Sequence, residues 1–260
     1  MSPYEFLKIE RRDRLAWIWL NRAPLNTLTI EFMDEIDRAF AELGSDREVD
    51  VVLLGSKVPG FYCNGLDPDY LLERDVPARA LVFERLFEMM RAMYAFEKPS
   101  AAVIDGHAMA GGAVLGVLND FRFMSDGRYR FCFSEVLVGL TIPAALLDVI
   151  AGVTGRAALR DVAMLGTAYR APEARAIHLI DEVFPAATLH EEAEARMRNL
   201  LPMAQPSLRQ IKKEIRSPVV QRLAEFQKST VRELEPFLSG NFEEGLRAVR
   251  DRRRPVFQNP

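Results

Sequence analysis

The chain has 260 residues, and 34 Lys and Arg against 37 Asp and Glu give a formal net charge of -3. Apolar residues make up 49% and charged residues 27%, which is typical of a globular protein and excludes disordered and collagen-like chains. The slightly acidic balance argues against nucleic acid as the main partner.

The two cysteines, Cys63 and Cys132, cannot form a disulfide framework. The opening residues, MSPYEFLKIERRDR, do not resemble a signal peptide. The most apolar stretches, Ala108–Leu118 and Ile142–Val153, are shorter than the ~20 residues that cross a bilayer, and both indicate buried helices. We therefore expect a cytoplasmic protein with no membrane segment.

The first half of the chain alternates strand-like and helix-like segments. The expected strands are Phe6–Ile9, Leu15–Leu20, Val51–Leu54 and Ser100–Ile104. Two helices are expected from apolar residues at helical spacing. The first has Thr29 as its N-cap and carries Ile30, Met33, Ile36, Phe40 and Leu43. The second carries Val82, Leu86, Met89, Met93 and Phe96. This order predicts an α/β fold with a largely parallel sheet.

From Ala187 onward nearly every segment has helical periodicity. We expect breaks near Pro202, Pro206 and Pro218 and a last helix from about Phe242 to Arg254. The predicted organisation is a core over residues 1–200 and a C-terminal helical region over residues 201–260.

Most chemical signatures are absent from the sequence. It contains no GxGxxG, no Walker-type phosphate loop, no GxSxG and no CxxC. The three histidines, His107, His178 and His190, share no ligand spacing with one another or with the cysteines, so no metal is predicted.

Two glycine-bearing turns each follow a strand and open a helix. The first is NGLDP at residues 64–68, where Asp67 suits an N-cap and Pro68 the first helical position. The second is GHAMAGGA at residues 106–113. Peptide N–H groups at a helix start have no intrahelical partner, so two such turns facing each other would form an oxyanion hole. The alternative is that both are only turns and caps.

Glu135 lies in the segment SEV, among apolar residues. Its carboxylate either turns out to solvent at a strand end or lies in a dry pocket, where its pKa would rise and suit proton transfer. Met89, Met90 and Met93 are expected in the core, with contact to a flexible acyl chain as the alternative.

Taken in order, these segments resemble the crotonase (enoyl-CoA hydratase/isomerase) superfamily. The motifs that carry the resemblance are NRAPLNTL at 21–28, VVLLGS at 51–56 with FYCNGLD at 61–67, KP at 98–99 with GHAMAGG at 106–112, and SEVLVGL at 134–140. They cover most of the chain in the family's order and spacing.

The resemblance implies a spiral of ββα units with a C-terminal helical region, assembled as a homotrimer or homohexamer. It places the peptide N–H groups of Leu66 and Gly111 on the thioester carbonyl of an acyl-CoA, and Glu135 as the acid/base. It also places Asn64 where a backbone carbonyl meets the adenine, and Arg252, in the last helix, at a coenzyme A phosphate. No separate cofactor is implied, because the substrate carries coenzyme A.

One departure from the family pattern decides the expected reaction. Typical hydratases of this superfamily place a second glutamate in the helix after the oxyanion glycine, and this chain has Val114 there. A single carboxylate suffices to move a double bond from C3 to C2, so the resemblance implies a Δ3,Δ2-enoyl-CoA isomerase. The alternatives are an enoyl-CoA hydratase-like lyase and a non-catalytic acyl-CoA-binding or scaffold protein.

Overall fold

The structure is a computed structural model that describes residues 3–227 and 229–258. Residues 7–184 alternate strands with helices, which confirms the alternation predicted for the first half of the chain and extends it. The strands are β1 (Leu7–Arg12), β2 (Leu15–Leu20), β3 (Val51–Ser56), β4 (Gly60–Cys63), β5 (Ser100–Ile104), β6 (Gly106–Met109), β7 (Phe121–Ser125), β8 (Phe131–Cys132) and β9 (Glu182–Phe184). The α-helices are α1 (Ile30–Ser45), α2 (Pro68–Leu72), α3 (Val76–Tyr94), α4 (Gly111–Val117), α5 (Ala144–Thr154), α6 (Ala171–Ala176), α7 (Leu189–Arg198), α8 (Gln205–Gln227), α9 (Thr230–Leu234) and α10 (Asn241–Arg250).

Shorter helical turns are η1 (Glu135–Val138), η2 (Arg156–Ala158), η3 (Arg160–Met164) and η4 (Glu235–Phe237). Two sheets organise the described residues. The larger runs in the order β1-β2-β3-β5-β7-β9, and the smaller in the order β4-β6-β8. Every neighbouring pair is parallel except β1 with β2, so the predicted α/β fold with a largely parallel sheet is confirmed.

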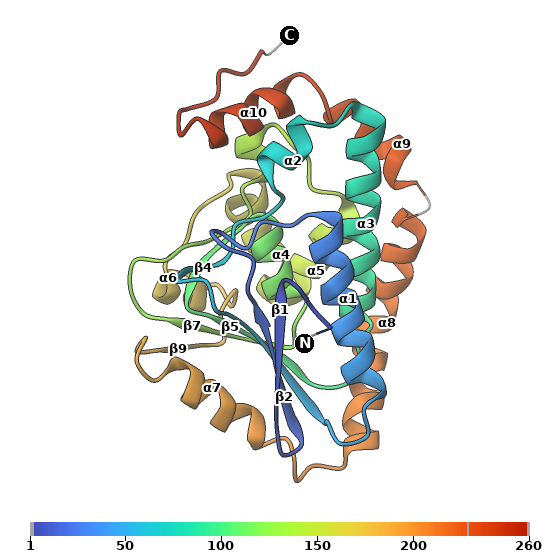
Figure 1. Ribbon diagram of the computed structural model, residues 1–260, viewed down its shortest axis with the longest axis vertical. Helices are drawn as coiled ribbons and strands as arrows, with labels where there is room; N and C mark the ends of the chain where they lie inside the picture. Colours follow the sequence, from blue (N-terminus) through green and yellow to red (C-terminus); the bar gives the residue numbers. More distant parts are fainter. Residues whose placement is uncertain (1–2, 228, 259–260) are drawn as a thin grey trace.

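The larger sheet is buried on both faces because alternate residues of its strands enter different apolar clusters. On β2, Ile18 and Leu20 pack in the cluster that includes α1 and α3, whereas Trp17 and Trp19 pack in the cluster that includes α7. Figure 1 shows α7 at one end of the molecule and α10, beside α2, at the opposite end.

The predicted helix starts are confirmed at two caps. The Thr29 hydroxyl accepts a hydrogen bond from Phe32 N at the start of α1. The Asp67 carboxylate accepts hydrogen bonds from Asp69 N and Tyr70 N, with Pro68 in the first turn of α2. The second cap fixes the turn over residues 64–68 against the body of the molecule.

Three boundaries differ from the prediction. The stretch Ala108–Leu118 is not a single helix, because its first residues pair in β6 with β4 and β8. Pro218 does not break the chain but lies inside α8. A proline there cannot donate to the Glu214 carbonyl, and the Ser217 hydroxyl donates to that oxygen instead, at 3.3 Å.

The last helix ends at Arg250 rather than Arg254. Arg252 takes the left-handed conformation, with φ of 52°. Its N–H donates to Val249 O and the Arg253 N–H donates to Ala248 O, which are the two bonds of a Schellman stop.

The C-terminal helices lie against the first half of the chain. α8 and α9 both contact α3, and α10 contacts α2 and η1. Residues from α3, α8 and α10 belong to one apolar cluster, and the division into residues 1–200 and 201–260 stays a prediction. No helix in the described ranges is both long and apolar enough to cross a membrane.

Candidate active site

The two predicted turns lie side by side because they follow neighbouring parallel strands. β4 pairs with β6, so the chain leaving Cys63 and the chain leaving Met109 emerge at the same edge of the smaller sheet. A methyl group placed on Gly65 would lie 3.2 Å from Gly111 N and 3.1 Å from Met109 O. Gly65 also has φ of +80°, a conformation that favours glycine.

The peptide N–H groups of Leu66 and Gly111 are both left without a protein acceptor in the described part of the chain. Leu28 forms a parallel bridge with Leu66, in which Leu28 N donates to Gly65 O at 2.8 Å and Asp67 N donates to Leu28 O at 3.1 Å. This bridge uses the carbonyl before Leu66 N and the N–H of the next residue, but not Leu66 N itself. Gly111 is the first residue of α4, where the N–H has no intrahelical acceptor and no side chain caps it.

The backbone before Gly111 is strained. Ala110 has φ of 47° and ψ of -116°. For a residue with a Cβ atom this backbone conformation carries ~1–3 kcal/mol of strain. Its N–H donates to Cys132 O at 2.8 Å, and its carbonyl accepts from Val114 N at 3.0 Å. These bonds hold the peptide that joins Ala110 to Gly111, and therefore the Gly111 N–H, in one orientation.

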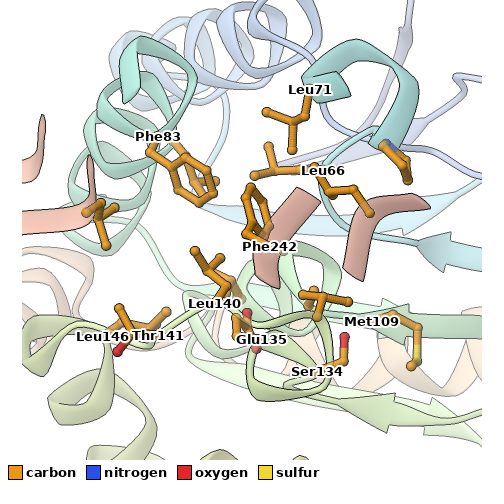
Figure 2. Close-up of a pocket in the computed structure, with 18 of the residues that line it drawn as sticks. Leu66, Leu71, Phe83, Met109, Ser134, Glu135, Leu140, Thr141, Leu146 and Phe242 are labelled. Atoms are coloured by element: carbon orange, nitrogen blue, oxygen red, sulfur yellow. The ribbon is translucent and has the colours of Figure 1, made fainter. Parts of the chain in front are cut away.

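Leu66 and Gly111 line the same cavity as Glu135, and the free volume of this cavity is about 180 Å³. Its walls come from α2, α3, α4, η1, α5, α9 and α10, and most of them are apolar (Figure 2). The lining side chains that carry a polar group are Asn64, Ser134, Glu135 and Thr141. A long apolar group can therefore fill most of the cavity while a few polar groups act on one part of it.

Glu135 is the first residue of η1 and only 7% of its surface is exposed. Burial raises its pKa to about 7, although its own backbone N–H partly opposes the shift. Within the described residues its Oε2 atom has no hydrogen-bond partner. Of the two positions that the sequence leaves open for this carboxylate, the structure has the dry pocket.

Glu135 is the only acidic residue that lines the cavity among those the structure describes. Val114, one turn into α4, is 2% exposed and contributes an isopropyl group to the wall. The site therefore combines one carboxylic acid of raised pKa with two unpaired peptide donors. No group of three or more His, Cys, Asp or Glu in the described ranges is placed to hold a metal ion.

The sequence model of the enoyl-CoA hydratase/isomerase family matches residues 10–260. The chain belongs to the enoyl-CoA hydratase/isomerase family. The described fold agrees with this assignment. The crystal structure of human mitochondrial Δ3,Δ2-enoyl-CoA isomerase superposes with a TM-score of 0.91 over 95% of this chain and 98% of its own, at 23% sequence identity. This chain therefore has the crotonase fold of the family.

Relatives in this family carry both isomerase and hydratase names. Mitochondrial enoyl-CoA delta isomerase 1 of Rattus norvegicus is 26% identical over 86% of this chain and 78% of its own. A Thermus thermophilus protein with a provisional enoyl-CoA hydratase name is 31% identical over 95% of this chain and 98% of its own. The rat relative is named as mitochondrial, and the cytoplasmic location of this chain stays a prediction.

The structure places the two expected coenzyme A residues in different surroundings. Asn64 directly follows β4 and lines the cavity. Arg252 does not belong to the last helix, contrary to the prediction, but to the turn that stops α10. Its side chain is exposed, and among the described residues its guanidinium forms no hydrogen bond or ion pair.

Sequence reasoning missed the walls that come from distant elements. Phe83, Phe87 and Met90 of α3 line the cavity, so Met90 contacts the site while Met89 and Met93 are core. α10 adds Phe242, Leu246 and Val249. These three residues are spaced four and three apart, which indicates an apolar stripe on one face of the helix. Nothing local in the sequence says which surface that stripe covers.

The buried Glu135 carboxyl has a measurable effect on stability. Its pKa is about 7 in the folded protein against an ordinary 4.5, so between these values the unfolded chain loses a proton that the folded chain keeps. The free energy of unfolding therefore falls as pH rises from about 4.5 to 7, by ~3 kcal/mol. Glutamine does not titrate, and we expect the stability of Glu135→Gln relative to the unaltered protein to grow by that amount between pH 4 and pH 8. Urea unfolding at the two pH values measures it, and a constant difference would contradict the dry pocket.

Proposed function

We propose that this member of the family is a Δ3,Δ2-enoyl-CoA isomerase. The observation that carries the proposal is the composition of the cavity, in which one carboxyl of raised pKa shares the space with two unpaired peptide N–H groups and Val114 takes the place of a second acid. Isomerisation adds no water and needs only one group that removes a proton and returns it.

The proposed reaction begins with the 3-enoyl thioester oxygen accepting hydrogen bonds from Leu66 N and Gly111 N. The Glu135 carboxylate removes a proton from C2, and the electrons of that C–H bond form a dienolate whose negative charge rests on the thioester oxygen. The protonated Glu135 then returns the proton to C4, and the double bond forms between C2 and C3. Atoms and electrons balance without an external oxidant or reductant.

The two peptide donors together have more weight than the acid in this scheme. Loss of one oxyanion donor typically costs about 3–4 kcal/mol of transition-state stabilisation. A positioned base typically contributes about 10²- to 10⁴-fold in rate. A pKa of about 7 suits Glu135 for both half-reactions, because the carboxyl is then partly ionised at neutral pH and binds the proton reversibly.

The proposed ligand is an acyl-CoA thioester, which brings coenzyme A with it, so no separate cofactor is proposed. Asn64 lines the cavity two residues before the Leu66 donor, and in the proposed complex its backbone carbonyl accepts a hydrogen bond from the adenine. Arg252 is exposed just after α10, and in the proposed complex its guanidinium binds a phosphate of coenzyme A. The proposed assembly is a homotrimer or homohexamer.

The hydratase name of the Thermus thermophilus relative makes hydration the second candidate. Incubation of the protein with trans-3-hexenoyl-CoA and, separately, with crotonyl-CoA distinguishes the functions. We expect the first to give trans-2-hexenoyl-CoA and the second to remain unhydrated. Hydration of crotonyl-CoA without bond migration would show the hydratase-like alternative, and binding of both without turnover would show the non-catalytic one.

A further inference from the structure

Arg79 is a buried charge outside the reacting groups, and it joins three separate segments to α3. Its side chain is 5% exposed. Its Nε donates to Leu71 O at 2.9 Å, and its Nη1 donates to Leu238 O at 2.8 Å and to Glu243 Oε1 at 2.5 Å. One guanidinium thus fixes the end of α2, the segment before α10 and the first turn of α10.

The segments that Arg79 holds carry walls of the cavity. Leu71 lines the cavity with its side chain while its carbonyl accepts from Arg79. Phe83, one turn after Arg79 on α3, meets Phe242 edge to face, with ring centroids 5.9 Å apart and planes at 63°. Phe242 is the neighbour of Glu243, so the ion pair and the ring pair form one contact between α3 and α10.

The other side of α10 is pressed against the element that bears the acid. A methyl group on Gly245 would lie 2.2 Å from Val138 O, and Val138 is the last residue of η1, which begins with Glu135. α10 therefore sits between η1 and α3, and Figure 2 shows the Phe242 ring projecting among the cavity residues. Phe83 of α3 and Phe242 of α10 both line the cavity, so a change in the separation of these two helices changes its size.

We propose that Arg79 is a positioning residue that holds the α10 wall closed and so limits the length of the acyl chain that the cavity accepts. This inference rests on the proposed acyl-CoA ligand. A long chain must move Phe242 away from Phe83, and that movement breaks the bonds of Arg79. Without the guanidinium, Glu243 keeps only its pair with Arg247 in the same helix, at 3.1 Å, and the ion pair that links α10 to α3 is lost.

The test compares the binding of two saturated thioesters, hexanoyl-CoA and tetradecanoyl-CoA, by titration calorimetry. Saturated chains bind without reacting, so the result does not depend on turnover. In Arg79→Met we expect the ratio of the tetradecanoyl-CoA Kd to the hexanoyl-CoA Kd to fall about tenfold from its value in the unaltered protein. Arg79→Lys keeps the charge but not the planar set of donors, so we expect its ratio to lie between that of Arg79→Met and that of the unaltered protein.

Arg85→Met is the matched control. Arg85 lies on the same helix, but its guanidinium pairs with Asp34 and Asp37 of α1 and does not line the cavity. We expect its ratio to stay within about twofold of the unaltered value. An equal fall in both variants would mean that any loosening of α3 changes the ratio, and would overturn the specific role of Arg79.

Two further variants keep the proposal testable if Arg79→Met does not fold. Glu243→Gln removes the charge of the partly exposed partner of Arg79, and we expect it to lower the ratio of the two Kd values about threefold. Phe242→Ala removes the ring from the wall and keeps Arg79, and we expect it to lower the same ratio. An unchanged ratio in the folded variants overturns the inference. Failure of the unaltered protein to bind either thioester overturns the proposed function as well, whereas binding without isomerisation overturns only the isomerase assignment.

Discussion

Replacing Glu135 with glutamine is expected to lower kcat for trans-3-hexenoyl-CoA isomerisation by about 10⁴-fold, the upper end of what a positioned base contributes. The reason for the upper end is that no second acid in the described residues lines the cavity. Glutamine keeps the shape of the side chain and the apolar surroundings, so the affinity for hexanoyl-CoA should stay close to that of the unaltered protein. Steady-state kinetics and calorimetry separate the two effects.

The control is Glu182→Gln, which makes the same change at a carboxylate paired with Arg196 on the surface. Its kcat should equal that of the unaltered protein. The unaltered protein should itself gain activity as pH rises and level off above about 7, because removal of the C2 proton needs the ionised carboxylate. Retained isomerisation in a folded Glu135→Gln protein would disprove the role of this side chain.

Local patterns predicted the parts of the site that lie next to a strand end. Each of these parts lies within a few residues of a short strand: the turns at Gly65 and Gly111, and the acid at Glu135. The turns were selected because glycines follow a strand, and Glu135 was selected because it is an isolated carboxylate after a strand. The two turns meet because β4 pairs with β6, which joins segments more than 40 residues apart, and Glu135 lies near them because β8 pairs with β6. The family resemblance supplied that pairing, which no local spacing contains.

The parts that escaped prediction depend on contacts over long distances in the sequence. Glu135 begins η1, and η1 packs against α10, a helix far later in the chain whose Gly245 lies on Val138. Pro218 was expected to break a helix on intrinsic grounds, yet α8 continues because it is packed along α3 and the Ser217 hydroxyl satisfies the released carbonyl. At Pro218 tertiary packing outweighed the local signal, and at Glu135 it decided between two positions that the sequence leaves open.

A second large effect is expected from Gly112→Ala, one residue beyond the proposed donor. In a helix, alanine normally stabilises by up to ~1 kcal/mol relative to glycine. Here the new methyl carbon would lie 1.9 Å from Cys63 O and 2.7 Å from Cys63 C, which are backbone atoms of β4. The strand must move, so we expect the free energy of unfolding to fall by about 3 kcal/mol.

The same movement should damage the site, because β4 leads directly into the turn that carries Leu66. A displacement of Leu66 N relative to Gly111 N by about 1 Å is expected to lower kcat/KM for trans-3-hexenoyl-CoA by about 100-fold. Urea unfolding and steady-state kinetics measure the two losses.

Gly152→Ala in α5 is the matched control for this substitution, since a methyl group there meets nothing within 4 Å. It should leave kcat/KM unchanged and raise stability by up to ~1 kcal/mol. A Gly112→Ala protein as stable and active as this control would show that α4 and β4 are not in contact at Cys63. The contact that fixes Leu66 N relative to Gly111 N would then be absent. The proposed binding of one thioester oxygen by both N–H groups depends on that contact.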